Sequence, residues 1–131
     1  MSVKILNFPK IHDPRGNLTF IQNPTHIPFE IKRIFWLQAK EQTIVGSAAI
    51  TGQEVIVCLK GSFEVVVTHF NGSTEKFVLN SPHQGLYLPP LTWRQIQNFS
   101  TDTTSFHLTS LQDNESDQIN DFETFKNKIK R

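Results

Sequence analysis

The chain has little of three features that define whole classes of protein. It has one cysteine, Cys58, so no internal disulfide can form, and its apolar neighbours predict a buried structural thiol. No apolar run approaches the roughly 18 residues that a membrane-spanning helix needs. Charged residues make up 19% of the 131 residues and the net charge is +1, so no broad field favours nucleic acid or an anionic membrane. We expect one cytoplasmic domain over residues 1–131, partnered by neither nucleic acid nor membrane.

Period-two alternation and β-branched or aromatic side chains dominate the chain up to about residue 111. Prolines at positions 82, 89 and 90 keep the strands of the second half short. Many short strands with frequent turns predict a small antiparallel barrel or jelly roll. The expected strands are Val3–Asn7, Leu18–Gln22, Ile31–Gln38, Ile44–Ile50, Glu54–Lys60, Phe63–Phe70, Glu75–Leu79, Gly85–Leu88, Gln95–Asn98 and Thr104–Leu111.

Two glycine-containing turns and the two ends of the chain carry further predictions. Lys60-Gly61-Ser62 is expected to close a tight hairpin, and Asn71-Gly72 to supply the two positive φ angles of a primed turn. Val3–Asn7 is expected at a sheet edge, where a second copy of the chain would cover it. Near the C-terminus we expect a short helix with Asp121 as its N-cap, based on the spacing of Phe122, Phe125 and Ile129.

Four local patterns follow one another along the chain: Asp13-Pro14-Arg15-Gly16-Asn17-Leu18, Ile31-Lys32-Arg33-Ile34-Phe35-Trp36, Val55 to Ser62, and Ser81-Pro82 through Gly85-Leu86-Tyr87 to Trp93. In this order they resemble the WxcM-like sugar 3,4-ketoisomerases, cupins that act on dTDP-4-keto-6-deoxyglucose. The resemblance runs from about Lys10 to Lys130. It implies an all-β cupin double-stranded β-helix, or jelly roll, that works as a homodimer on a dTDP-linked hexose in surface-polysaccharide biosynthesis.

The residues that perform the chemistry of that group are absent here. The group's motif reads Gly-x-His-Ala-His-Lys, and one histidine is the base that moves the proton between C3 and C4 of the sugar. This chain reads Gly46-Ser47-Ala48-Ala49-Ile50 instead. Neither serine alone nor alanine offers a base with a pKa near neutral pH, which the reaction needs. We therefore expect no catalytic residue at Ser47 or Ala49, and no ketoisomerase activity.

No metal or other cofactor is expected. A cupin metal centre needs a His-x-His pair that converges with a downstream carboxylate and a further histidine. None of the histidines of this chain belongs to such a pair, and only His107, between Phe106 and Leu108 on a late strand, is placed to point into a barrel. The five histidines are His12, His26, His69, His83 and His107.

Arginines and aromatic residues are the candidates for binding a nucleotide sugar. Arg15 matches the Arg-Gly of the resembled group, where it implies substrate contact, and Arg33 lies within an apolar strand. Guanidinium groups match phosphate oxygens bidentately, although a surface salt bridge is the alternative role for both. Arg94 stands where the group usually has a histidine, and either adds an anion contact or fills space. Trp93 either stacks on the thymine ring or packs at the rim.

Two functions remain open from the sequence, besides a ligand-free structural role. The first is a dTDP-sugar-binding cupin that has lost its acid–base groups. The second is a nucleotide-sugar isomerase or epimerase whose chemistry has moved to Tyr87, Glu54 or His107. Glu54 is adjacent to Gln53, so only one of these two side chains can face the pocket.

Overall fold

The computed structural model describes residues 2–23, 25–40, 46–69, 71–111 and 118–119. Within these residues the chain forms strands and no helix, and no helix long and apolar enough to cross a membrane occurs among them. The strands are β1 (Lys4–Asn7), β2 (Lys10–Asp13), β3 (Gly16–Thr19), β4 (Arg33–Ala39), β5 (Gly46–Ile50), β6 (Glu54–Lys60), β7 (Phe63–Thr68), β8 (Thr74–Leu79), β9 (Gln84–Leu88), β10 (Trp93–Gln97), β11 (Thr103–Thr109) and β12 (Gln118–Ile119).

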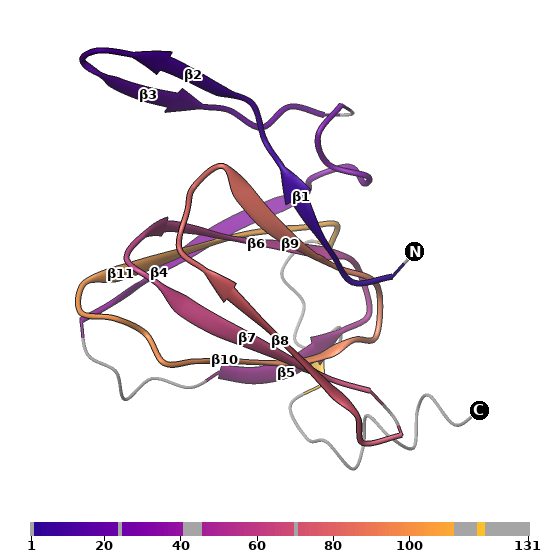
Figure 1. Ribbon diagram of the computed structural model, residues 1–131. Helices are drawn as coiled ribbons and strands as arrows, with labels where there is room; N and C mark the ends of the chain where they lie inside the picture. The colour runs from indigo at the N-terminus through magenta and orange to yellow at the C-terminus, as the bar shows by residue number, and fades with distance from the viewer. Residues whose placement is uncertain (1, 24, 41–45, 70, 112–117, 120–131) are drawn as a thin grey trace.

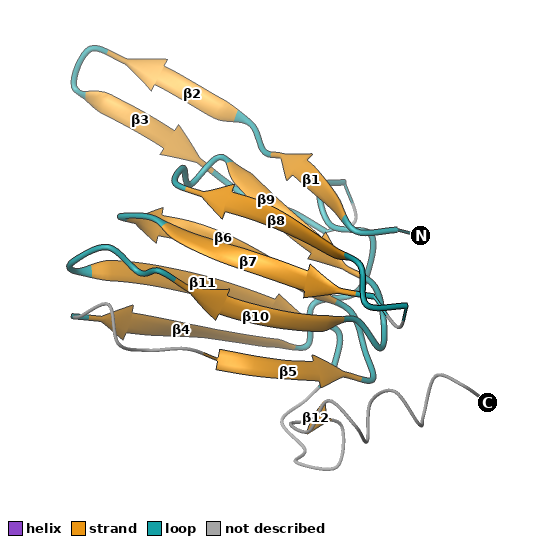
Figure 2. Cartoon of the chain, turned by 60° about the horizontal axis from the view of Figure 1, so that its bottom comes forward, coloured by secondary structure: helices purple, strands orange, loops and turns teal. Residues whose placement is uncertain are grey.

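Two antiparallel sheets face each other and form the cupin jelly roll that the sequence predicts (Figure 1). One sheet has the strand order β1-β9-β6-β11-β4, and the other has the order β12-β5-β10-β7-β8. The β2–β3 hairpin belongs to neither sheet and projects beside the first one (Figure 2). β1 lies at an edge of its sheet, as predicted for a strand that proline follows.

The space between the two sheets is apolar over most of its length. Alternate residues of the central strands point into it, so that β7 buries positions 63, 65 and 67 while the residues between them stay half-exposed. Phe63 and Phe99 lie with their ring centroids 5.4 Å apart. The thiol of Cys58 is buried here, and burial raises its pKa to about 11. The fully or almost fully buried residues of this core are Ala39, Ile56, Cys58, Phe63, Val65, Val67, Leu79, Leu86, Leu88, Ile96 and Phe99.

A second apolar cluster covers part of the outer face of the β1-β9-β6-β11-β4 sheet. Its residues come from the opposite face of β6, β9 and β11, from the segment between β3 and β4, and from the link between β1 and β2. Phe29 packs at a ring distance of 6.4 Å from Tyr87. The cluster consists of Phe8, Ile27, Phe29, Val55, Val57, Tyr87 and Leu108. Both faces of β6 are therefore buried, which explains its nearly continuous apolar run.

The turn at Gly61 differs from the sequence prediction. β6 pairs with β9 and β11, whereas β7 pairs with β8 and β10, so Lys60-Gly61-Ser62 passes from one sheet to the other. The predicted hairpin is wrong because both strands bury side chains between the sheets and thus face each other across the core. Gly61 has a φ of 83°, and a Cβ there would lie 2.5 Å from Thr103 Oγ1.

The turn between β7 and β8 is a hairpin, as predicted, but of another type. Gly72 has a φ of 90°, and its amide donates to the His69 carbonyl at 2.9 Å, so Asn71 and Gly72 are not the two central residues of a two-residue primed turn. The His69 amide donates to the Ser73 carbonyl, and the Ser73 amide donates to the Asn71 side chain. The loop is therefore longer than the sequence predicted.

Two short elements were missed, and one predicted element cannot be compared. β2 was not predicted, and β3 occupies residues 16–19 where a strand at Leu18–Gln22 was expected. β12 pairs with β5 and was also missed. The predicted C-terminal helix lies outside the described residues.

Candidate functional site

Three polar interior residues gather at one end of the barrel, where β6 and β10 begin and β11 ends. They are Glu54, Arg94 and His107. Each lies two positions from an inward-facing residue of its own strand, which is Ile56 on β6, Ile96 on β10 and Ser105 on β11. Their exposed fractions are 2%, 8% and 3%. Strand alternation thus places a carboxylate, a guanidinium and an imidazole in the interior without any insertion or bulge at these residues.

Glu54 and Arg94 form a buried, bidentate ion pair. Arg94 Nε donates to Glu54 Oε1 at 3.2 Å, and Arg94 Nη2 donates to Glu54 Oε2 at 3.3 Å. The two residues are 40 positions apart in the chain and lie on opposite sheets. A buried pair of this kind is costly to break from one side, because the remaining charge is then left in the interior.

His107 connects this ion pair to Ser105. Its Nδ1 lies 3.2 Å from Glu54 Oε2, and its Nε2 lies 2.9 Å from Ser105 Oγ. Because an ionised carboxylate only accepts hydrogen bonds, Nδ1 carries a hydrogen and donates it to Glu54. The hydrogen bonds therefore run in a continuous line from Ser105 through His107 and Glu54 to Arg94.

The electrostatics of the cluster keep Glu54 ionised. Burial by itself raises the pKa of this carboxyl group, but the charge of Arg94 and the hydrogen bonds from His107 and Arg94 outweigh it. The net effect lowers the pKa of Glu54 to about 2. Such a carboxylate holds no proton near neutral pH and is a weak base.

Phe35 covers the imidazole on the side of β4. The rings of Phe35 and His107 are stacked, with centroids 4.5 Å apart and planes 4° from parallel. The Arg33 guanidinium lies over the ring of Phe35, with Cζ 4.5 Å from the ring centre. Arg33 is half-buried at the first residue of β4, so it stands at the outer end of the polar cluster.

The structure brings together some of the predicted site residues and separates others. Glu54, Arg94 and the inward-facing His107 form one cluster, with Arg33 beside it. Trp93 is buried, but its position next to Arg94 on β10 places it on the opposite face of the sheet.

Tyr87 lies outside the barrel interior, in the outer apolar cluster. Its hydroxyl donates to Gln53 Oε1 at 2.6 Å, and burial raises its pKa. Of the neighbours Gln53 and Glu54, it is therefore Glu54 that faces the interior, while Gln53 is directed toward Tyr87.

Arg15 is distant from this cluster. It lies in the turn of the β2–β3 hairpin with 91% of its side chain exposed. Its Nε donates to Asp13 Oδ1 at 3.0 Å, which together with the backbone bond lowers the pKa of Asp13. Within one chain, Arg15 and Arg33 are not brought together, so their shared role in ligand binding stays a prediction.

The positions of the missing histidines lie on β5. On the side of β10, Ser47 pairs with Gln95 and Ala48 pairs with Arg94. On the side of β12, Ala49 pairs with Ile119. Ala49 is buried. The side chain of Ser47 lies outside the described part of the structure.

Sequence reasoning missed Ser105 and the contact of Phe35 with His107. The signal that identifies Ser105 is a polar row with period two on an otherwise apolar strand. Its members are all buried, and they are Thr103, Ser105, His107 and Thr109. Solvent-facing polar rows have the same pattern, so only the burial of these side chains and the contact of His107 with Glu54 show that this row faces inward.

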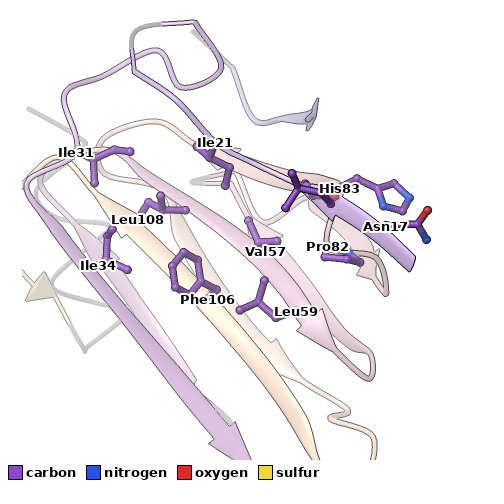
Figure 3. A pocket seen from close by; sticks show the side chains of 12 residues that line it. Asn17, Ile21, Ile31, Ile34, Val57, Leu59, Pro82, His83, Phe106 and Leu108 are labelled. Carbon is purple, nitrogen blue, oxygen red and sulfur yellow. The ribbon is translucent and has the colours of Figure 1, made fainter. Parts of the chain in front are cut away.

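An apolar groove of about 650 Å³ lies between the β2–β3 hairpin and the outer face of the neighbouring sheet (Figure 3). Ile34, Val57, Leu59 and Phe106 form its floor (Figure 3). Leu18 of the hairpin also lines the groove. It is separate from the polar cluster, because its floor is the opposite face of the sheet. No group of three or more metal-ligating side chains occurs among the residues with described side chains.

Comparisons with known proteins agree with this architecture. The family model described as FdtA: WxcM-like, C-terminal matches residues 1–130. The TDP-4-oxo-6-deoxy-alpha-D-glucose-3,4-oxoisomerase of Aneurinibacillus thermoaerophilus is 36% identical over 98% of this chain and 94% of its own. A 3,4-ketoisomerase from Helicobacter canadensis superimposes with a TM-score of 0.93 at 32% identity, covering 100% of this chain and 99% of its own. The sugar 3,4-ketoisomerase QdtA from Thermoanaerobacterium thermosaccharolyticum, in complex with TDP, has a TM-score of 0.91 at 28% identity, covering 98% and 95%.

Proposed function

Because the chain belongs to the WxcM-like, C-terminal (FdtA) family, we propose that it binds a dTDP-linked hexose and does not catalyse 3,4-ketoisomerisation. The family resemblance and the TDP complex of QdtA support the ligand class. The proposed binding residues are Arg15, Arg33, Trp93, Arg94, Tyr87 and Glu54.

We propose the absence of ketoisomerisation because the remaining acid–base groups already form hydrogen bonds with one another. Ketoisomerisation needs a base that reaches a carbon-bound proton. The Glu54 carboxylate, with its pKa near 2, is held by Arg94 and His107, and both ring nitrogens of His107 have partners. Phe35 also covers one face of the imidazole. Together with serine and alanine at positions 47 and 49, this leaves the described interior without an accessible base.

Binding is tested by titration calorimetry of the full chain with dTDP-glucose. We expect saturable binding, with UDP-glucose as the control for recognition of the thymine base. Absence of any heat or saturation with dTDP-glucose contradicts the ligand class, whatever the outcome for catalysis.

Catalysis is tested by following deuterium incorporation from D₂O at C3 of dTDP-4-keto-6-deoxyglucose with NMR. The Aneurinibacillus oxoisomerase, which is 36% identical, serves as the positive control under the same conditions. We expect exchange at the enzyme-free rate for this chain, because removal of a general base costs about 10²–10⁴-fold in rate. Exchange clearly above that rate means that another residue acts as the base.

One observation favours an altered isomerase or epimerase as a second candidate. The order Ser105, His107 and Glu54 is that of a hydroxyl, a base and an orienting carboxylate. Ser105 is fully buried, however, so a substrate reaches this line only if the interior opens. The exchange experiment separates the two candidates, and the His107→Gln variant then identifies the base.

We further propose that the protein is a cytoplasmic homodimer that acts in surface-polysaccharide biosynthesis. The apolar groove supports a second copy as partner, since Ile34 and Leu59 on its floor are 47% and 45% exposed. A dimer also offers a way for the hairpin residue Arg15 to reach the polar cluster of another subunit. Light scattering at micromolar concentration tests the oligomeric state, and a monomeric mass contradicts it.

A further inference from the structure

His107 can gain a proton without losing either of its hydrogen bonds. With a neutral ring, Nδ1 donates to Glu54 at 3.2 Å and Nε2 accepts the Ser105 hydroxyl hydrogen at 2.9 Å. A hydroxyl is both donor and acceptor, and its hydrogen can rotate. When Nε2 carries a proton, the same Ser105 oxygen therefore accepts it. The two contacts fit both protonation states with no movement of the heavy atoms.

Next to His107, the charges of Glu54 and Arg94 cancel each other. Glu54 on β6 contributes one negative charge and Arg94 on β10 one positive charge, and the two are in direct contact. The other charged or titratable groups with described side chains near the ring are Arg33, beyond Phe35 on β4, and Cys58, the register partner of Ser105 on β6. A net charge in such a buried cluster is costly, so a change at one member favours a compensating change at another.

Arg94 is the least buried of the three, with 8% of the residue exposed, against 3% for His107 and 2% for Glu54. Glu54 takes Nε and one hydrogen of Nη2, and a guanidinium has five N–H groups in all. The residues with described side chains leave no buried side-chain nitrogen or oxygen without a partner, so the cluster is complete before any ligand arrives. A ligand anion placed on the far edge of Arg94 would add a negative charge that nothing in the cluster offsets.

We propose that His107 takes up a proton from solvent on Nε2 when an anionic ligand binds at Arg94. The inference rests on the proposed function, in which the diphosphate of a nucleotide sugar supplies the anion. The proton offsets one of the two negative charges of the diphosphate, with Glu54 between two cations and Arg94 between two anions. Because linked binding equilibria are reciprocal, protonation of His107 also strengthens binding, and affinity rises as the pH falls.

The coupling is measured by titrating the protein with dTDP-glucose in several buffers of different ionisation enthalpy, slightly above neutral pH. The diphosphate of dTDP-glucose is a diester and does not itself change its protonation there. We expect the observed enthalpy to vary linearly with the buffer's ionisation enthalpy, with a slope that reports net proton uptake. His107→Gln should bind with that slope abolished. His12→Gln, which removes an exposed histidine of β2, should keep the wild-type slope.

The outcomes separate this inference from the function on which it rests. Binding with no dependence on the buffer overturns the coupling and leaves the ligand class intact, whereas no binding at all overturns both. A slope that persists in His107→Gln places the proton elsewhere and also overturns the inference. If His107→Gln does not fold, the ring protons of His107 in the wild-type NMR spectrum report its protonation with and without ligand. A spectrum that shows no added protonation counts against the proposal.

Discussion

The ring of Phe35 lies parallel to that of His107, at a centroid distance of 4.5 Å, and the two residues are direct register partners on β4 and β11. The pair closes the polar cluster on the side of β4. It also joins the cluster to the more exposed Arg33, which lies over Phe35. One aromatic side chain thus separates a buried imidazole from a cation at the end of the barrel.

Phe35→Ala should lower the free energy of unfolding by about 2–4 kcal/mol, because it removes the ring that packs on His107. Phe35→Leu, which keeps apolar volume without the stack, should lose less. Urea denaturation measures both changes. Phe20→Ala, which removes a more exposed phenylalanine, is the control and should cost less than Phe35→Ala. Equal costs at the two positions would show that the stack contributes nothing.

Arg94→Leu should destabilise the fold by about 3–5 kcal/mol, because it leaves the buried Glu54 carboxylate without its ion-pair partner. Adding Glu54→Gln to this variant should restore part of the loss, since the amide carries no charge and still accepts from His107. The measurement is a double-mutant cycle by chemical denaturation. Strict additivity of the two substitutions would contradict a coupled pair.

Stability should fall in acid with a contribution from Glu54. The pKa of this carboxyl is about 2 in the folded chain and near its ordinary value of 4.5 in the unfolded chain. Between these pH values the unfolded state binds the proton and the folded state does not, so the contribution is present above 4.5 and is lost toward 2. Its size is on the order of 3 kcal/mol. The free energy of unfolding of Glu54→Gln should vary less steeply with pH in this window, and an unchanged slope would disprove the assignment.

Arg15→Ala and Arg33→Ala should each weaken dTDP binding by about 1.5–3 kcal/mol, the range for hydrogen bonds to charged groups. Titration calorimetry measures the affinities. Lys76→Ala removes an exposed cation of β8 and serves as the control for a general loss of positive charge. Unchanged affinity in both arginine variants removes the assignment, and a loss only in Arg33→Ala restricts the site to the barrel.

Ile34→Glu should shift the protein from dimer to monomer, because it places a charge on the floor of the apolar groove. Ile34 is 47% exposed within one chain, so the substitution should leave the fold itself intact. Val78→Glu alters a somewhat more exposed apolar residue on β8, in the other sheet, and should leave the dimer unchanged. A dimer in both variants would exclude the groove as the interface.

Those parts of the fold with local signals were predictable. The run from Glu54 to Lys60 is β-branched and bounded by a glycine turn, and β6 has these same bounds. The hairpin of β2 and β3 was not fully recognised because its residues are mostly exposed and carry no apolar alternation. The Gly61 turn was misassigned because a glycine with positive φ suits both a hairpin and a crossing between sheets.

The candidate site was predictable residue by residue but not as an assembly. Alternation predicted that only one of Gln53 and Glu54 faces inward and left open which of them does, whereas His107 was correctly predicted as the inward histidine. The contact of Glu54 with Arg94 joins residues 40 positions apart on different sheets, and no local pattern specifies it. Tyr87 was named with Glu54 and His107 as a possible site of relocated chemistry, although its strand position directs it to the other face of the sheet.

The ion pair of Glu54 and Arg94 also affects how this chain can change over evolutionary time. A residue of the apolar core can be replaced by another of similar volume in a single step, at modest cost. Neither Glu54 nor Arg94 can be replaced in this way, because each intermediate carries one buried, unmatched charge. The codons for these two residues are therefore expected to be inherited and lost as a unit.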